Sequence, residues 1–386
     1  MKKIIFLFFV SLTLLSCSGR QTRKADRCLQ QIAEDVNAVG ISVAVIRDNQ
    51  IIYTGASGLK NIQTEEKLRP SDLMRIASIS KSFTATAIMQ LYEAGCFDLD
   101  DDIGDALGFP VRNPHHPDIP ITYRMLLSHT SSLSDKGGYF TLDVIRPEIT
   151  PDVSGSFNEY APGTGYQYCN LGFNTLGVLV EIHSSGRFDQ YIRNNILDPL
   201  GVYASFNVND LDTNRFATLY AFEEGRFVPS PQAYNPRTEE IDNYVEGFSA
   251  PVFSPTGGMK INAPDLARHA LIQMNDGFFN DTEILSPQSV ALMQTPQSPG
   301  GRSSEDEACG YGFALERTDK LIEGEIMTGH TGSAYGLYSA MFFQKDKKFG
   351  FIVLCNGCDS SLPLRENGFM PVQTDVINAL YDIFIR

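Results

Sequence analysis

The sequence predicts an α+β fold, in which helices flank an antiparallel sheet and a mainly helical region is inserted between the segments that form the sheet. Three observations support this prediction. Apolar segments rich in β-branched and aromatic residues occur near both ends of the 386-residue chain. Patterns with helical spacing dominate its middle. Hydrophobic residues make up 42% of the chain and charged residues 20%, a balance typical of a globular protein with a large core.

The first residues have the pattern of an export signal. Lys2 and Lys3 precede an apolar run over residues 4–15, which is shorter than the ~20 residues of a membrane-spanning helix but fits the core of a signal peptide. The run ends in Leu-Leu-Ser-Cys at Cys17 and resembles the lipobox of bacterial lipoproteins, whose cysteine becomes the lipidated first residue. A plain secretory signal followed by a chance cysteine is the alternative.

A lipidated Cys17 would hold the protein on a membrane surface without a spanning helix. We therefore expect a signal peptide over residues 1–16, followed by the lipidated cysteine and a polar, basic tether over residues 17–26. Ser18 stands after the cysteine in place of aspartate, which favours the outer membrane of a Gram-negative cell. The expected location is the cell envelope, with the protein facing the periplasm or the cell surface.

The segments that follow predict a hairpin between two helices. Helical spacing is found over residues 28–37 and again over residues 82–92, where Gly95 ends the second helix. Residues 40–46 and 51–54 are apolar and β-branched, and they flank Arg-Asp-Asn-Gln, a turn-forming stretch. They are therefore predicted to pair as a β-hairpin.

Helices are predicted for the middle of the chain and strands for its end. The helical patterns cover residues 123–128, 170–183, 188–196 and the closing 372–384, and the strand patterns cover 311–316, 338–344 and 349–354. Residues 27–80 and 258–386 are therefore expected to form one composite domain, and residues 81–257 a mainly helical one. A cleft between two such bodies is a common position for an active site.

Charge and composition argue against several classes of function. The formal net charge is −15 and no basic run is present, so nucleic acid is not expected as a partner. His115 and His116 lie in a Pro-rich loop without further ligands, and the acidic run over residues 98–102 lacks the spacing of a calcium loop. We predict no metal site and no cofactor.

The strongest candidate for a nucleophile is Ser78, which together with Lys81 forms a Ser-x-x-Lys motif where the helix over residues 82–92 begins. Positions i and i+3 lie on one face of a helix, so the hydroxyl and the amine can meet. The positive end of the helix dipole favours an anion that develops at Ser78. A lysine that is partly buried loses its proton more easily and can then activate the hydroxyl.

A second copy of the motif lies at Ser57 and Lys60. It follows the predicted strand over residues 51–54 in a Gly-rich turn, where no helix aligns the two side chains. The spacing alone is weak evidence in a chain of this length. The context therefore favours Ser78.

Two further motifs carry groups that suit acyl transfer. Tyr168 has Asn170 two positions later, and a phenol with an amide beside it can serve as acid or base and position a lysine or a carbonyl. His330 and Thr331 precede Gly332, a residue that lets a substrate lie along a strand edge. The N–H of Ser333 could then join that of Ser78 in an oxyanion hole. Taken alone, a loop tyrosine, a capping asparagine and a structural histidine are the competing interpretations.

In this order, the three motifs resemble those of the serine β-lactamase and penicillin-binding superfamily. Their flanks resemble the class C β-lactamase-related family, which also holds D-alanyl-D-alanine carboxypeptidases, esterases and acyl-transferring enzymes. The flanks are residues 75–83 (RIASISKSF), 121–130 (ITYRMLLSHT), 162–164 (PGT), 170–172 (NLG) and 329–332 (GHTG). The resemblance runs from about Gly40 to the final helix and implies the β-lactamase and penicillin-binding-protein fold.

The resemblance also implies a role for each residue. Ser78 would be acylated, Lys81 would accept or relay its proton, Tyr168 would be the partner acid or base, and Asn170 would position. Thr331 and Gly332 would shape the sheet edge, with the amides of Ser78 and Ser333 as the oxyanion hole. His330 would stand where true class C β-lactamases carry lysine. A histidine is mostly neutral at pH 7, which weakens the case for β-lactams and favours esters, amides or peptides.

The predicted function is that of a serine hydrolase that cleaves or transfers the acyl group of an ester, amide or peptide. Transfer to an alcohol, D-Ala-D-Ala carboxypeptidase activity and β-lactamase activity are alternatives. A sensor that only binds penicillin or peptidoglycan is the alternative outside the enzymes. Aromatic residues in the segments 136–160 and 203–253 either line an acyl pocket or belong to the core, and His129 is expected to be structural.

Overall fold

The computed structural model describes the backbone of residues 2–302 and 306–386, and the side chains from residue 19 onward within these ranges. Over these ranges the largest sheet has eight antiparallel strands in the order β12-β13-β14-β15-β16-β1-β2-β3. The strands are β1 (Gly40–Arg47), β2 (Gln50–Asn61), β3 (Glu66–Lys67), β12 (Gly310–Tyr311), β13 (Glu316–Ile322), β14 (Glu325–Ala334), β15 (Leu337–Gln344) and β16 (Phe349–Cys355). Strands from the two ends of the chain therefore share one sheet, as predicted.

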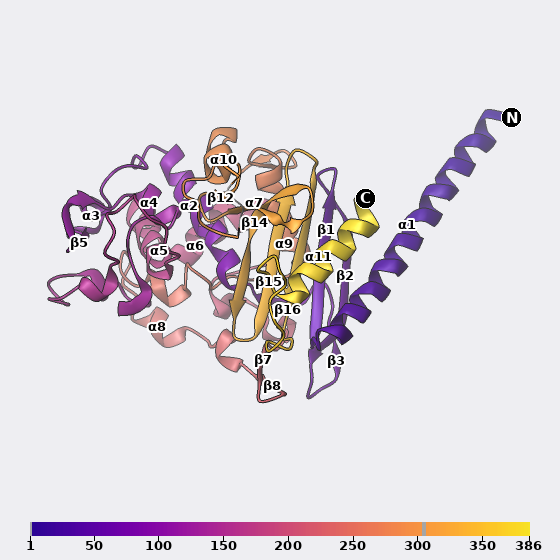
Figure 1. Ribbon diagram of the computed structural model, residues 1–386, viewed down its shortest axis with the longest axis horizontal. Helices are drawn as coiled ribbons and strands as arrows, with labels where there is room; N and C mark the ends of the chain where they lie inside the picture. The colour runs from indigo at the N-terminus through magenta and orange to yellow at the C-terminus, as the bar shows by residue number, and fades with distance from the viewer. Residues whose placement is uncertain (1, 303–305) are drawn as a thin grey trace.

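Helices cover both faces of this sheet. On one face lie α1 (Lys2–Asp35) and α11 (Pro371–Phe384), which contact each other (Figure 1). α1 packs mainly on β2, and α11 packs mainly on β15 and β16. On the other face α9 (Ala263–Met274) packs against β1, β15 and β16. Both faces of β1 are buried: Val43 and Val45 contribute to the core under α1 and α11, and Ala44 and Ile46 to the core under α9. This explains why residues 40–46 do not alternate between apolar and polar positions and are apolar apart from the buried Ser42.

The mainly helical part lies on the far side of α9, away from α1 and α11 (Figure 1). Its helices are α2 (Ser80–Glu93), α3 (Ile103–Leu107), α4 (Tyr123–Leu127), α5 (Asn170–Ser184), α6 (Phe188–Ile192), α7 (Asp198–Leu200) and α8 (Thr238–Asp242), and α10 (Pro287–Gln294) follows α9 in the chain. α2 packs against α5 and is buried on nearly every side. Between α6 and α7 the chain forms a π-helical turn at Arg193–Leu197, so the helix predicted over residues 188–196 is not regular throughout.

Four two-stranded pairs complete the described strands. They are β4 (Met74–Arg75) with β9 (Lys260–Ile261), β5 (Arg112–Asn113) with β6 (His116–Pro120), β7 (Tyr220–Glu223) with β8 (Arg226–Pro229), and β10 (Phe278–Phe279) with β11 (Thr282–Glu283). The first pair matters for the site, because β4 leads directly into the turn that carries Ser78.

The prediction of one strand over residues 311–316 is wrong. β12 ends at Tyr311 and β13 begins at Glu316, and a turn joins them. Ala314 has a φ of 57°, a left-handed conformation that does not continue a strand. The apolar and aromatic composition of this stretch reflects burial, which a turn under α10 satisfies as well as a strand.

Residues 19–26, expected as a polar tether, are part of α1 instead. The helix predicted from residue 28 extends upstream because Ala25 is fully buried against the sheet and Gln21 donates a hydrogen bond to the Ile383 carbonyl of α11 at 2.8 Å. The N-terminal part of α1 projects beyond the body of the protein (Figure 1). The side chain of Cys17 lies outside the described residues, so its lipidation stays a prediction.

Within the part of the chain that the structure describes, no helix combines the length and the apolar character needed to cross a membrane.

Candidate active site

The turn before α2 places Ser78 next to Lys81. Ser78 lies in a 3₁₀ turn, Ala77–Ile79, that runs into α2, and Lys81 is in the first turn of that helix. The Lys81 Nζ atom lies 3.2 Å from Ser78 Oγ. Ala77 has a φ of 49°, so the residue before the candidate nucleophile holds a strained conformation of the kind that gathers at functional sites.

Three acceptors surround the Lys81 amine. Besides Ser78, the Asn170 side-chain carbonyl lies 2.9 Å away and the Thr256 backbone carbonyl 2.8 Å away. A neutral amine has two N–H bonds and one lone pair. The two carbonyls can take the two hydrogens, which leaves the lone pair facing the Ser78 hydroxyl.

Burial allows Lys81 to carry a neutral amine at physiological pH. The Lys81 side chain is fully buried, and removal of water lowers its pKa to about 7, while the negative charge of Asp135 acts in the opposite direction. A neutral amine is therefore well populated near pH 7. Such a group can accept the proton of Ser78.

Tyr168 lies over the same lysine. Lys81 Nζ is 4.7 Å from the centre of the Tyr168 ring. The phenolic oxygen is buried and has no hydrogen-bond partner of good geometry among the described residues. Burial raises the pKa of Tyr168 well above its usual range, although the nearby Ser78 hydroxyl offsets part of this effect. The residue is therefore a protonated phenol, which suits a proton donor rather than the phenolate base that the sequence left open.

His330 is held as a neutral imidazole. It lies on β14, where its Nε2 atom is 3.0 Å from the Tyr311 hydroxyl and its Nδ1 atom contacts the Thr331 backbone carbonyl. Burial, reinforced by the charge of Lys81, lowers the pKa of His330 to about 3. The histidine thus supplies no positive charge at pH 7, consistent with its expected neutral state.

Gly332 lets β14 approach the turn that carries Ser78. A Cβ atom at this position would come within 2.2 Å of the Ile76 carbonyl oxygen. The same carbonyl accepts a hydrogen bond from Ser339 on β15 at 3.0 Å, which fixes the turn against the sheet. Only a residue without a side chain fits between strand and turn, and Ser333 follows it at the mouth of the site.

Two cavities meet at Ser78 and Ser333. The first cavity has a volume of about 290 Å³ and is lined by Ser78, Tyr166, Tyr168, Gly301, Arg302, Tyr311, Glu316, His330, Thr331 and Ser333. The second cavity has a volume of about 340 Å³ and is lined by Arg75, Ala77, Ser78, Tyr139, Phe140, Asn170, Ser254, Thr256, Gly257, Ser333, Ala334 and Tyr335. A substrate whose reacting carbonyl lies at Ser78 can therefore extend to both sides.

Arg302 in the first cavity was not predicted from the sequence. It donates to the Thr331 hydroxyl at 2.9 Å and pairs with the nearly buried Glu316 at 2.7 Å. The positive charge in this cavity is therefore largely neutralised. Nothing around Arg302 in the sequence marks it, because its partners lie on strands that follow later in the chain.

Asp135 was also not predicted, and it orients Asn170. The carboxylate accepts hydrogen bonds from the Asn170 side-chain amide at 2.9 Å, from the Asn170 backbone N–H at 3.0 Å and from the Leu171 N–H at 2.9 Å. It caps the N-terminus of α5, where Cys169 supplies no cap. With its amide nitrogen held by Asp135, Asn170 presents its oxygen to Lys81.

His129 supports the segment that carries Tyr168. Its Nδ1 atom accepts a hydrogen bond from the Cys169 backbone N–H at 3.1 Å, and its ring centre lies 4.3 Å from that of Tyr168. Burial keeps the pKa of His129 well below its usual value, so it too is neutral. It makes no hydrogen bond to Ser78 or Lys81 among the described contacts.

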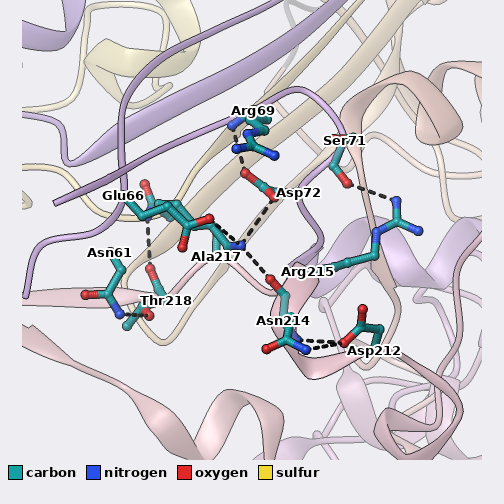
Figure 2. A network of polar contacts seen from close by, with 12 residues as sticks. Asn61, Glu66, Arg69, Ser71, Asp72, Asp212, Asn214, Arg215, Ala217 and Thr218 are labelled. Atoms are coloured by element: carbon teal, nitrogen blue, oxygen red, sulfur yellow. Dashed lines mark hydrogen bonds and ion pairs between the residues drawn. The ribbon is translucent and has the colours of Figure 1, made fainter. Parts of the chain in front are cut away.

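The second Ser-x-x-Lys copy has a different environment. Ser57 and Lys60 both lie within β2, which is longer than the predicted strand because its pairing with β1 continues to Gly58. Lys60 Nζ bonds to Glu66 at 3.1 Å, lies 3.5 Å from Asp72 and donates to the Asn214 carbonyl. Figure 2 shows how these partners tie the sheet edge to the segment around Asn214. Lys60 is thus held by charged partners and is not available to Ser57.

No group of three or more His, Cys, Asp or Glu side chains among the described residues is placed to hold a metal ion. The six cysteines from Cys28 to Cys358 are free thiols in the described part of the chain.

Comparisons with known proteins place this geometry in a family. The family model described as Beta-lactamase matches residues 25–367. Penicillin-binding protein 4 of Amycolatopsis lactamdurans is 29% identical over 312 residues, which make up 78% of this chain and 76% of the relative.

Solved structures show the same fold. The octameric penicillin-binding protein homologue from Pyrococcus abyssi is 25% identical, with a TM-score of 0.72 over 93% of this chain and 76% of that chain. EstCE1, described as a hydrolase with promiscuous acyltransferase activity, is 20% identical, with a TM-score of 0.71 over 94% of this chain and 99% of that one. The predicted fold is confirmed.

The family match includes the Ser-x-x-Lys turn, the Tyr-x-Asn loop and the His-Thr-Gly strand. This chain belongs to the Beta-lactamase family of serine hydrolases.

Proposed function

We propose that the protein hydrolyses an ester, amide or peptide through an acyl-enzyme on Ser78. The observation that carries this proposal is the 3.2 Å contact between Ser78 Oγ and a Lys81 amine whose pKa is about 7. A buried neutral amine beside a hydroxyl is the arrangement that an activated serine requires.

Acylation begins when Ser78 Oγ attacks the substrate carbonyl and its proton moves to Lys81 Nζ. The oxyanion that forms is stabilised by the backbone N–H groups of Ser78 and Ser333. The Tyr168 hydroxyl then protonates the leaving group and is reprotonated from Lys81. The bond from the carbonyl to the leaving group breaks, and the acyl group remains on Ser78.

Deacylation repeats these steps with water. Lys81 accepts a proton from the water molecule that attacks the acyl carbonyl, and Ser78 leaves with a proton. The Tyr168 hydroxyl supports this scheme, since it is buried at the site and no described residue holds it away from Ser78 and the substrate. Because Tyr168 lines the first cavity, the leaving group departs on that side.

Neutral esters and amides suit the first cavity better than β-lactams. His330 carries no charge near pH 7, and Arg302 is paired with Glu316. The fixed cation that would attract the carboxylate of a β-lactam is therefore missing from the lysine position of class C β-lactamases. We rank β-lactamase activity below ester, amide and peptide hydrolysis for this reason.

Transfer to an alcohol or amine is the second candidate, and the two cavities that meet at Ser78 support it. A leaving group can exit from the first cavity, and an acceptor can replace it there while the acyl group stays in the second. Adding an alcohol to the ester assay and weighing the products separates transfer from hydrolysis. A new ester among the products would favour transfer.

The test of the proposed function uses a fluorophosphonate probe and a panel of p-nitrophenyl esters. Wild-type protein and the Ser57→Ala variant should be labelled and should turn over at least one ester, whereas Ser78→Ala should do neither. Labelling that is lost in Ser57→Ala and kept in Ser78→Ala would contradict the assignment. Labelling without turnover of any ester, amide or peptide would indicate a binding protein instead.

We also propose that Cys17 is lipidated and holds the protein on the envelope. The apolar run that ends in Leu-Leu-Ser-Cys supports this. Wild-type protein should incorporate a radiolabelled fatty acid and sediment with membranes. Cys17→Ser should lose both properties, and a soluble, unlabelled wild type would contradict the proposal.

A further inference from the structure

The second cavity holds a guanidinium that pairs with no acidic side chain among the described residues. Arg75 lines this cavity together with Ser78, and its residue is only 7% exposed. It lies on β4, three positions before Ser78, so the cation and the candidate nucleophile belong to one short segment.

The contacts of Arg75 leave part of its hydrogen-bonding capacity free. Its Nε atom donates to the Gly257 carbonyl at 2.8 Å, and its guanidinium carbon lies 5.1 Å from the centre of the Tyr335 ring. Neither terminal nitrogen has a hydrogen-bond partner or an ion-pair partner among the described residues. A guanidinium has five N–H donors in a planar arrangement. The N–H groups on the two terminal nitrogens of Arg75 therefore remain able to donate to a ligand.

Among the described residues, no acidic side chain pairs with Arg75. Lys260 on the paired strand β9 is buried and donates to the Phe206 carbonyl at 2.7 Å, and burial holds the pKa of Lys260 well below its usual value. Arg237, which is paired with Glu240, acts on Arg75 as a like charge. A buried cation without a counter-ion is energetically unfavourable. An anion that enters this cavity can therefore form an ion pair with Arg75 that no described residue forms.

The two cavities therefore differ in their charge. In the first, Glu316 already neutralises Arg302. The second cavity is lined by Asn170 but not by Asp135, whose carboxylate accepts hydrogen bonds from three N–H groups. Among the described residues that line the two cavities, Arg75 is therefore the cation left without an acidic partner for an anionic group of the substrate.

The orientation of the reaction assigns this side to the acyl part of the substrate. The proton donor Tyr168 lines the first cavity and not the second, so the leaving group is directed to the first. The acyl part then extends over Asn170 towards Arg75. Tyr139, Phe140 and Tyr335 give the second cavity aromatic walls that suit a short hydrocarbon chain.

We propose that the second cavity binds an acyl chain that ends in a carboxylate and that Arg75 pairs with this carboxylate. The preferred donors are then monoesters or monoamides of dicarboxylic acids. Cleavage breaks the bond between the acyl carbon and the leaving group, and it releases the dicarboxylate after the acyl group has been carried on Ser78. This proposal rests on the proposed function.

The experiment compares p-nitrophenyl monoesters of succinic, glutaric and adipic acid with the same compounds whose free carboxylate is capped as a methyl ester. The pairs share chain length and leaving group, so the ratio of their kcat/KM values isolates the carboxylate. For the best chain length, the wild type should prefer the free carboxylate at least tenfold. In Arg75→Gln this ratio should fall at least tenfold, and in Arg75→Lys it should be partly kept.

Arg302→Gln is the matched control, because it removes the other arginine of the site. It should keep the ratio of the wild type, whatever its effect on the absolute rates. If Arg302→Gln abolishes the preference and Arg75→Gln keeps it, the assignment is overturned. Equal rates for capped and free esters in the wild type would also overturn it.

A second measurement covers the case in which Arg75→Gln does not fold. Glutaric acid monoamide and glutaramide are compared as competitive inhibitors of the wild type, and the charged compound should bind at least tenfold more tightly. Equal inhibition would contradict the proposal. Failure of the proposed function gives a different result, because no ester of either series would then acylate Ser78.

Discussion

Asp135 and Asn170 are 35 positions apart in the chain, yet the carboxylate of the first accepts a hydrogen bond from the side-chain amide of the second at 2.9 Å. This contact decides which end of the Asn170 amide faces Lys81. With the nitrogen taken by Asp135, the oxygen accepts from the Lys81 amine at 2.9 Å. Asp135 therefore acts on Lys81 in two ways. Its negative charge raises the pKa of Lys81, and its hydrogen bond orients the Asn170 side chain that contacts the lysine.

Asp135→Asn should therefore change both the rate and its pH dependence. Loss of the carboxylate removes the charge that raises the pKa of Lys81, so the acidic limb of the pH–rate profile should move to lower pH. The misplaced Asn170 should lower kcat/KM by about 10²-fold at the plateau. A lower rate with an unchanged limb would indicate a purely structural role for Asp135.

The pH dependence of the wild type tests the state of Lys81. The active form has a neutral amine, so kcat/KM should fall about tenfold per pH unit below about 7 and level off above it. Burial raises the pKa of Tyr168, so its deprotonation should cause no second decline below pH 10. An acidic limb centred near the ordinary lysine pKa of about 10.4 would contradict this account.

Gly332→Ala should damage the site through packing alone. The added methyl group would meet the Ile76 carbonyl, so β14 must move away from the turn that carries Ser78. We expect a loss of about 1–3 kcal/mol in the free energy of unfolding and a larger relative loss of activity. Gly155→Ala is the control, because no atom lies within 4 Å of its added Cβ. Chemical denaturation and ester turnover measure both effects, and a fully active Gly332→Ala would refute the close approach.

His330→Lys should raise the affinity for penicillins relative to neutral esters. The buried imidazole is neutral, whereas a lysine would bring a positive charge to the first cavity. We expect the rate of Ser78 acylation by penicillins, divided by the rate for neutral esters, to rise about tenfold, or ~1.4 kcal/mol. His330→Gln, which adds no charge, should show no gain. A His330→Lys variant without a gain would undercut the electrostatic explanation.

The sequence predicted the candidate groups that lie within short motifs, and the structure brings these groups together. Ser78 and Lys81 are recognised because three positions on a helix give one face, and Tyr168 and His330 because of the residues beside them. The decoy at Ser57 and Lys60 was set aside on its context, and the structure adds the reason: Lys60 is held by Glu66 and Asp72.

Residues that act through tertiary contacts were not predicted. Arg302 donates a hydrogen bond to Thr331, which lies 29 positions later in the chain. Asp135 can orient Asn170 only because α5 begins at Asn170 and presents its N–H groups to the carboxylate. Neither pairing leaves a pattern in a single sequence. Arg75 appeared in the sequence only as part of a motif flank, since its proposed role depends on its having no acidic partner among the described residues, which a single sequence does not show.

The fold was predicted well where periodicity and burial agree. The first strand of the hairpin, its turn and the closing helix were predicted within one or two positions of the observed elements, whereas the second strand continues to Asn61 and not to residue 54. The strand over residues 311–316 failed because its apolar residues are buried in a turn. Residues 19–26 are helical although they are mostly polar, because a helix needs only one buried side and Ala25 lies on that side.

The most direct measurement of the central claim is the mass of peptides from protein that is quenched with acid during turnover of a slow ester. We predict that the acyl group of the ester is found on the peptide that contains Ser78, and that its amount decreases as the pH is lowered through 7. An acyl group on Ser57 or another residue, or the absence of any acylated peptide while the ester is consumed, would contradict the account.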